Sequence, residues 1–157
     1  VLMLLAEILK DYSGKYAIEL VAFNGEDYYA VPGQMKYLEQ NEGKLGNILM
    51  NINIDGAGYI EGPSCFYAFE LPSGIRKALD EVIENNTDIV EGLPWYQGDH
   101  TMFIQRGVPA IAVSSHRFIE TFAEQDITHT PKDNLEIVNY ERVVECATGI
   151  VELIGKL

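Results

Sequence analysis

Residues 47–55 read NILMNINID, a mostly apolar stretch that ends in an acid and follows the turn residues Gly43 and Gly46. An apolar run bounded by turn residues is typical of a strand. Two further stretches resemble it, YAIELVAF at 16–23 and PAIAVS at 109–114. Short, nearly continuous apolar runs indicate strands that are buried on both faces, as in parallel sheets.

Helical patterns alternate with these predicted strands. Apolar residues recur at helical spacing over residues 1–11 and 139–157, and we expect further helices at 32–40, 73–85 and 99–106. This alternation predicts an α/β fold, a three-layer α/β/α sandwich around a mostly parallel sheet. Residues 57–70 show no clear pattern, and residues 117–134 are expected to form a polar, ordered loop. The length of 157 residues, without repeats or linkers, predicts a single domain over 1–157.

The composition excludes several classes of protein. A formal net charge of −13 argues against a nucleic-acid partner, because phosphate binding needs a basic face. No run approaches the ~18 apolar residues of a membrane span, and the N-terminal VLMLLAEILKDY lacks the basic region of a signal peptide. Cys65 and Cys146 lack metal-type spacing and are expected to be buried free thiols, which favours a reducing, cytoplasmic location. The acidity suits a soluble surface, and it also favours cationic ligands such as a metal ion or a free amine.

Acidic side chains follow two of the predicted strands. Glu26 and Asp27 come just after residues 16–23, and Asp55 ends residues 47–55. Ligands of open α/β sheets bind beyond the carboxyl ends of the strands. Neighbouring carboxylates repel, and one solution gives one of them to a metal and leaves the other for proton transfer. Simpler interpretations stay open: an exposed acidic loop before a helix, and a turn aspartate followed by Gly56.

Two histidines stand next to acids. His129 lies in THTP with Asp133 four positions on, and a metal-binding imidazole usually donates its other N–H to such a carboxylate or to a carbonyl. Asp99 and His100 open a predicted helix. The alternatives are a solvated loop histidine for His129 and a helix N-cap for Asp99.

Four blocks, taken in order, resemble the co-catalytic two-zinc aminopeptidases, whose relatives include glutamate carboxypeptidase-type enzymes and glutaminyl cyclases. The blocks are VAFNGEDYYAVPG, NINIDGAG, GDHTMFIQRGVPAIAVSS and THTPKDN. They extend over nearly the whole chain, and four ordered blocks are far more specific than one. The resemblance implies metal-dependent hydrolysis of the bond after a free N-terminal residue, with a peptide as partner and two zinc ions in an intact site.

The resemblance also implies roles for single residues. Glu26 would be the general base and acid, Asp27 and His129 would bind one zinc, and Asp55 would bind the other. The family usually has Glu where this chain has Asp27, which leaves the metal preference open. Tyr96 would steady the tetrahedral intermediate. Three residues would line the substrate pocket or support the ligands: Asp99, His100 and Asp133.

One part of the family pattern has no counterpart in this chain. The family carries two earlier ligands, a His in a His-x-Asp block and an Asp that bridges both metals. The three histidines here are His100, His116 and His129, all late in the sequence. The resemblance therefore implies the C-terminal portion of a catalytic domain, lacking the first strands of the sheet and inactive by itself. Two alternatives remain: a non-catalytic domain that binds a partner or forms a homo-oligomer, and a glutaminyl-cyclase-like transferase.

Overall fold

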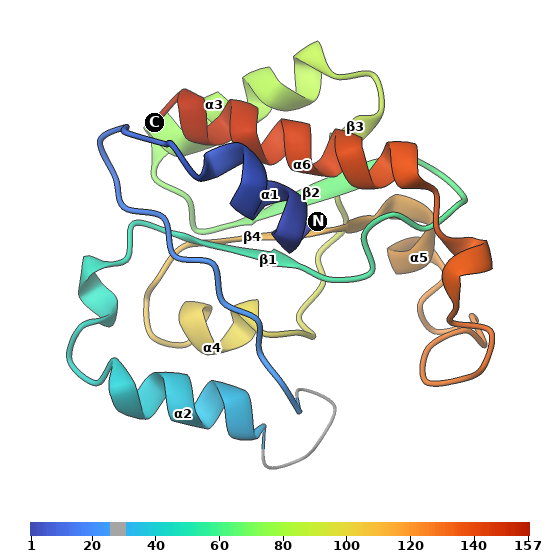
Figure 1. Ribbon diagram of the computed structural model, residues 1–157, viewed down its shortest axis with the longest axis horizontal. Coiled ribbons are helices and arrows are strands. Elements are labelled where there is room, and N and C mark those ends of the chain that lie inside the picture. The colour runs from blue at the N-terminus through green and yellow to red at the C-terminus, as the bar shows by residue number, and fades with distance from the viewer. Residues whose placement is uncertain (26–30) are drawn as a thin grey trace.

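The computed structural model describes residues 1–25 and 31–157, which form a sheet flanked by helices. Figure 1 shows helices on both faces of this sheet. The elements in chain order are α1 Leu2–Leu9, α2 Pro32–Gln40, the 3-10 helix η1 Leu45–Asn47, β1 Asn51–Ile54, β2 Ser64–Phe69, α3 Ser73–Asn85, β3 Ile89–Glu91, α4 His100–Ile104, β4 Ala110–Ser115, α5 His116–Glu120, the 3-10 helix η2 Leu135–Ile137 and α6 Tyr140–Gly155. In the part of the chain so described, no helix is long and apolar enough to cross a membrane.

The sheet has the strand order β1-β4-β2-β3. Strand β1 pairs in parallel with β4, and β2 pairs in parallel with β3. The central pair, β2 and β4, is antiparallel. Two of the three pairings are therefore parallel, which confirms the predicted mostly parallel sheet and the α/β class.

The layers follow from alternation along β4, whose residues are all buried. Ile111 and Val113 face a core that includes residues of α1, α3 and α6. Ala110 and Ala112 face the opposite side, where they pack with Phe69 and Trp95. Successive side chains of a strand point to opposite faces, so one strand serves two apolar layers. Figure 1 shows α1, α3 and α6 on one face and α2 with α4 on the other, which confirms the three layers.

Most predicted helices are present with small shifts at their ends. The helix predicted at 73–85 is α3, and the C-terminal one is α6, where the Asn139 side chain accepts hydrogen bonds from the backbone N–H groups of Glu141 and Arg142. The predicted helix 99–106 is shorter, since α4 covers His100–Ile104. Gly107, with a φ of +74°, follows it. The expected polar loop after 117 contains the end of α5.

The predicted strand at 16–23 is not one in the structure. These residues carry no strand pairing, although Val21 and Phe23 still pack against a small core around Tyr37. The expected burial on both faces is wrong as well, since each of these residues is exposed or partly buried. A strand needs a neighbouring strand with free N–H and C=O groups, which an apolar run alone does not supply. Conversely, β2 lies in the stretch 57–70 that shows no clear pattern, and β3 has three residues. The predicted free thiols are confirmed, since Cys65 and Cys146 are buried and unpaired with each other.

Candidate functional site

Asp55 lies directly after β1, at the carboxyl end of that strand, as predicted. Its backbone N–H donates a hydrogen bond of 3.0 Å to the carbonyl of Val113 on β4. The pairing of β1 with β4 therefore reaches Asp55 and fixes where its backbone lies. The side chain belongs to an exposed residue, so its carboxylate is within reach of solvent ions.

The glycines after Asp55 admit neighbouring side chains rather than an open approach to an ion. At Gly56, with a φ of +63°, an added Cβ would lie 2.9 Å from Ser114 Oγ and 3.0 Å from Phe118 Cδ1. At Gly58, with a φ of +90°, it would lie 2.6 Å from Val143 Cγ2. Both positions also need a backbone conformation that favours glycine. The small residues are thus explained by packing of the chain on itself.

The loop after Asp55 is tied to the segment that follows His129. The N–H of Ile60 donates to the carbonyl of Ile137 over 2.9 Å, and the N–H of Asn139 donates to the carbonyl of Gly58 over 2.8 Å. Tyr59 and Val138 form the bridge between these bonds. Two of the four sequence blocks are therefore held together through their flanking segments.

His129 is an exposed residue with a φ of +61° in the turn-rich loop 121–134. The loop is ordered by its own side chains, as predicted. The side-chain Oε1 of Gln125 accepts from the N–H groups of Ile127 and Thr128 at 2.6 and 3.0 Å, and Thr130 Oγ1 donates to the backbone carbonyl of Ile127 over 2.7 Å. These bonds hold the backbone next to His129.

Asp99 occupies the N-cap position of α4 without making the side-chain cap that the simpler interpretation predicts. Its Oδ1 instead accepts a hydrogen bond of 2.5 Å from Nε2 of Gln34 on α2. Burial raises the pKa of the Asp99 carboxyl, and the bond from Gln34 and the nearby His100 oppose that shift. Asp99 therefore connects α4 with the helix that follows Glu26 and Asp27.

His100 is fully buried, with 0% of its surface exposed, so it is not open to a substrate pocket. Its Nε2 lies 2.8 Å from the Trp95 carbonyl oxygen, and its Nδ1 lies 3.3 Å from Nδ2 of Asn53. Burial lowers the pKa of the imidazole, and the bond to the Trp95 carbonyl and the nearby Asp99 oppose that shift. Of the two roles that the resemblance implies for His100, this burial favours support of neighbouring residues over lining of a substrate pocket, and the role itself stays a prediction.

The remaining predicted residues lie on the surface. Tyr96 is 67% exposed, and its ring contacts that of Phe69 at a centroid distance of 5.4 Å. Asp133 is exposed, and its N–H closes a turn on the Thr130 carbonyl. Their roles toward a substrate or toward His129 stay predictions.

Glu26 and Asp27 lie outside the described residues. Among residues 1–25 and 31–157, no group of three or more His, Cys, Asp or Glu side chains is arranged to hold a metal ion. Asp55 and His129 thus form no such group with other described residues. The predicted set that includes Asp27 stays a prediction.

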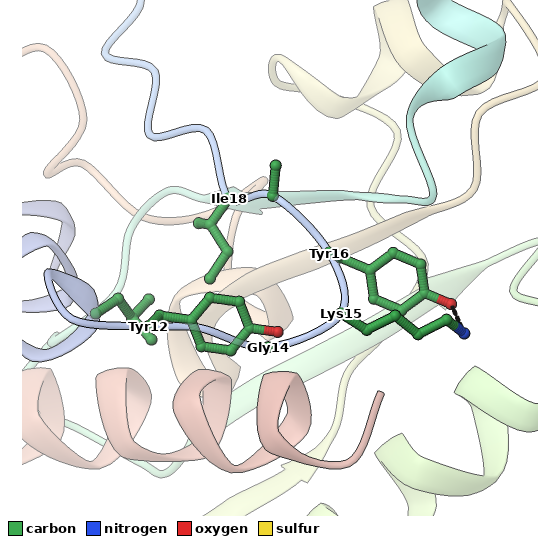
Figure 2. A pocket seen from close by; sticks show the side chains of 7 residues that line it. Tyr12, Gly14, Lys15, Tyr16 and Ile18 are labelled. Atoms are coloured by element: carbon green, nitrogen blue, oxygen red, sulfur yellow. Dashed lines mark hydrogen bonds between the residues drawn. The ribbon is translucent and has the colours of Figure 1, made fainter.

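The hollows of the described structure include a groove and a smaller hollow. The larger, of about 620 Å³, is a groove lined by residues 16–23, by 47–54 including β1, and by Asp99. The smaller, of about 380 Å³, lies beside the end of α1 and is lined by residues that include Tyr12, Gly14 and Tyr16. Figure 2 shows the Tyr12 ring next to Gly14, and Lys15 reaching the Tyr16 hydroxyl. Among the predicted site residues that the structure describes, Asp99 lines the larger groove.

Sequence reasoning missed Asn53 and Gln34, which contact His100 and Asp99. For Asn53 a signal was present. It is a polar residue within the mostly apolar run that contains β1, two positions before Asp55. Gln34 carries no such signal, because its partner is 65 positions away.

Comparison with known proteins identifies the class and then the family. The fold is shared with solved aminopeptidase structures, whose sequence identity to this chain is so low that the likeness shows the fold alone. The structure of BSAP, a zinc aminopeptidase from Bacillus subtilis, matches with a TM-score of 0.76 and 20% identity, over 98% of this chain and 39% of that one. An aminopeptidase from Aneurinibacillus sp. strain AM-1 matches with a TM-score of 0.72 and 18% identity, over 98% and 36%.

The family profile of Peptidase family M28 matches residues 1–154, and the chain belongs to this family. No curated protein matches the chain. The chain spans well under half the length of the two solved structures, 39% and 36%. The predicted resemblance to the two-zinc peptidases is confirmed at the level of the family.

Proposed function

We propose that this chain contributes to a zinc-dependent aminopeptidase, which hydrolyses the peptide bond after a free N-terminal residue. The observation that carries the proposal is the match to Peptidase family M28 over residues 1–154, because this range contains all four sequence blocks. The two solved structures of the same fold, named as aminopeptidases, support the choice of reaction within the family.

The donors in the chain are of the right kind for zinc. Carboxylate oxygen and imidazole nitrogen are common zinc ligands. Asp55 and His129 are both exposed residues, so neither is sealed from a metal ion by the core. Under the proposal Asp27 and His129 hold one zinc and Asp55 holds the second.

Zinc, when bound, supplies a Lewis acid that polarises the scissile carbonyl and lowers the pKa of water. The chain supplies the proton carrier. Glu26 takes a proton from the attacking water and passes it to the leaving amine, which is general base and then general acid catalysis. Tyr96 is exposed beside Phe69, and its hydroxyl donates a hydrogen bond to the oxygen on which negative charge develops.

Zinc binding tests the proposal on the chain itself. We expect residues 1–157 to bind less than two equivalents of zinc in equilibrium dialysis with elemental analysis, because the sequence offers three candidate ligands for two ions. Asp27→Ala and His129→Ala should each weaken binding at least about tenfold, since losses even in the outer shell cost 10–100-fold.

Asp88→Ala is the matched control, because Asp88 is an acid that pairs with Arg142 at 2.8 Å and belongs to none of the four blocks. It should bind zinc like the wild type. Unchanged zinc binding in both Asp27→Ala and His129→Ala would contradict the ligand assignment. Two tightly held zinc ions per chain would show that other residues complete the site.

A further inference from the structure

His100 differs from the other histidines of the chain in its burial. It is 0% exposed, whereas His116 is partly buried and His129 is exposed. A buried imidazole without a hydrogen-bonded partner on each nitrogen would be costly. Here both ring nitrogens have partners, one on a loop and one on a strand.

The partners determine which nitrogen carries the proton. The backbone oxygen of Trp95 can only accept, so His100 Nε2 must donate across the 2.8 Å that separates them. In a neutral ring Nδ1 is then an acceptor, and it receives the Asn53 side-chain N–H over 3.3 Å. The two bonds are compatible with a single neutral form of the ring, protonated on Nε2.

Packing holds the ring in this orientation. Its centroid lies 5.2 Å from that of Phe69, with the planes 31° apart, and 5.6 Å from that of Trp95. Gly98, with a φ of +108°, covers the Nδ1 side. A Cβ there would lie 3.2 Å from Asn53 Nδ2 and 3.4 Å from His100 Nδ1. The glycine therefore leaves room for the bond between Asn53 and His100.

The bonds of His100 join two parts of the candidate site. Asn53 belongs to β1 and stands two positions before Asp55, which directly follows that strand. Trp95 belongs to the loop 92–99, which also carries Tyr96 and Asp99. Asp99, the residue before His100, binds Gln34 of α2. One side chain thus links the end of β1 to this loop, and the loop in turn is linked to α2.

We propose that His100 is a positioning residue, which fixes the loop 92–99, with Tyr96 and Asp99, against the carboxyl end of β1 by donating to Trp95 and accepting from Asn53. The proposal rests on the proposed function for the purpose of the loop, because Tyr96 and Asp99 are assigned to that site. It does not rest on metal or on turnover. The test below therefore measures the loop directly on residues 1–157.

The ring form is measured on the unaltered chain. Nitrogen chemical shifts of the His100 ring in a labelled sample should show a proton on Nε2 and none on Nδ1. A ring protonated on Nδ1, or an even mixture of both forms, would overturn the proposal, because the bond from Asn53 could not then form. This measurement needs no variant and so does not depend on the folding of one.

The loop position is measured by amide hydrogen exchange. His100→Phe keeps the ring packing and removes both hydrogen bonds, and we expect exchange in residues 92–99 and β1 to become roughly 10-fold faster. Exchange in α6 should stay unchanged, which separates local release from general destabilisation. The fluorescence of Trp95, the single tryptophan, should become more accessible to acrylamide.

Two variants complete the test. His100→Gln retains one N–H donor and one acceptor, and it should restore most of the protection that His100→Phe loses. His116→Gln is the matched control, because His116 also opens a five-residue helix, α5. It should leave hydrogen exchange in residues 92–99 unchanged.

Equal effects of His100→Phe on the loop and on α6, or no effect on the loop, would overturn the proposal. A chain that binds no zinc would instead contradict the proposed function and leave these readouts intact.

Discussion

Nε2 of Gln34 donates a hydrogen bond of 2.5 Å to Oδ1 of Asp99, and this bond joins α2 to the start of α4 across 65 positions of sequence. Asp99 is part-buried, so its carboxylate has lost part of its contact with water. The bond from Gln34 compensates that loss. It also connects the block that contains Asp99 with α2, the helix that begins at the end of the block that contains Glu26 and Asp27.

Gln34→Ala should therefore destabilise the fold by about 1–2 kcal/mol at pH 7, since hydrogen bonds to charged groups are worth more than neutral ones. Urea unfolding measures the change. Gln40→Ala is the control, because Gln40 is an exposed residue at the other end of α2. Equal losses from the two substitutions would show that the bond to Asp99 contributes nothing beyond helix propensity.

Asp99 should make stability depend on pH in a defined direction. Its pKa in the folded chain is raised, first by burial, so the folded state holds this proton to higher pH than the unfolded state does. The free energy of unfolding should then fall as pH rises from about 3.9, the unfolded value, through the raised pKa of Asp99, and stay at the lower level above it.

Asp99→Asn lacks this group and still offers an oxygen to Gln34. Urea unfolding of both chains between pH 4 and pH 8, without added metal, should show the wild type losing stability relative to Asp99→Asn as pH rises. A difference that is constant over this range, or that changes in favour of the wild type at high pH, would contradict the raised pKa.

Two glycines of α6 should respond in opposite directions to the same substitution. At Gly149 an added Cβ would lie 2.4 Å from Ile89 Cδ1 and 3.3 Å from Phe66 Cζ, and both neighbours are buried. Gly149→Ala should cost about 1–3 kcal/mol by overpacking. At Gly155 nothing lies within 4 Å, and Gly155→Ala should be neutral or stabilise by up to about 1 kcal/mol. Thermal unfolding of the two variants measures the sign of each change in stability. A stabilising Gly149→Ala would be inconsistent with this packing.

The sequence predicts those parts of the fold whose signal is local. β4 and β1 are short apolar runs between turn residues, and α6 has a stripe of apolar side chains and an asparagine cap. β3 has three residues, too few for any periodicity. Residues 16–23 show why an apolar run alone is insufficient. Their side chains are apolar enough for a strand, but pairing depends on which segment lies beside them in space.

The candidate site is predictable to the same extent. Asp55 could be placed at a strand end because the run before it is local, and its position there is confirmed. The bonds of Gln34 to Asp99 and of Asn53 to His100 join residues 65 and 47 positions apart. Such bonds leave no spacing in the sequence. The bond from Gln34 accompanies an Asp99 that stands at the N-cap position of α4 without a side-chain cap, and the bond from Asn53 accompanies the burial of His100, which the sequence did not indicate.

Substitutions of Glu26 and Asp27 should have different effects, the first on proton transfer and the second on metal binding. Glu26→Gln keeps the size of the side chain and removes the base, so zinc binding should be unchanged while turnover falls about 10²–10⁴-fold, the usual value of general acid–base catalysis. Asp27→Ala should lose zinc first. Dialysis on residues 1–157 measures the metal. Zinc loss in Glu26→Gln comparable to that in Asp27→Ala would reverse the two assignments.

Turnover should require ligands that are not among the residues of this chain. The resemblance implies a His-x-Asp block and a bridging Asp, and the three histidines here lie at positions 100, 116 and 129. Two zinc ions that act together are held ~3.5–4 Å apart, and a symmetric pair of these chains supplies no bridging carboxylate of that block. We therefore expect residues 1–157 to show no zinc-dependent hydrolysis of aminoacyl chromogenic substrates.

A polypeptide that combines these residues with such a block should hydrolyse these substrates, and chelators should inhibit it. Zinc-dependent turnover by residues 1–157 alone, abolished by Glu26→Gln, would mean that side chains of this chain complete the metal site, and the assignment of Asp27, Asp55 and His129 as its only ligands would have to be abandoned.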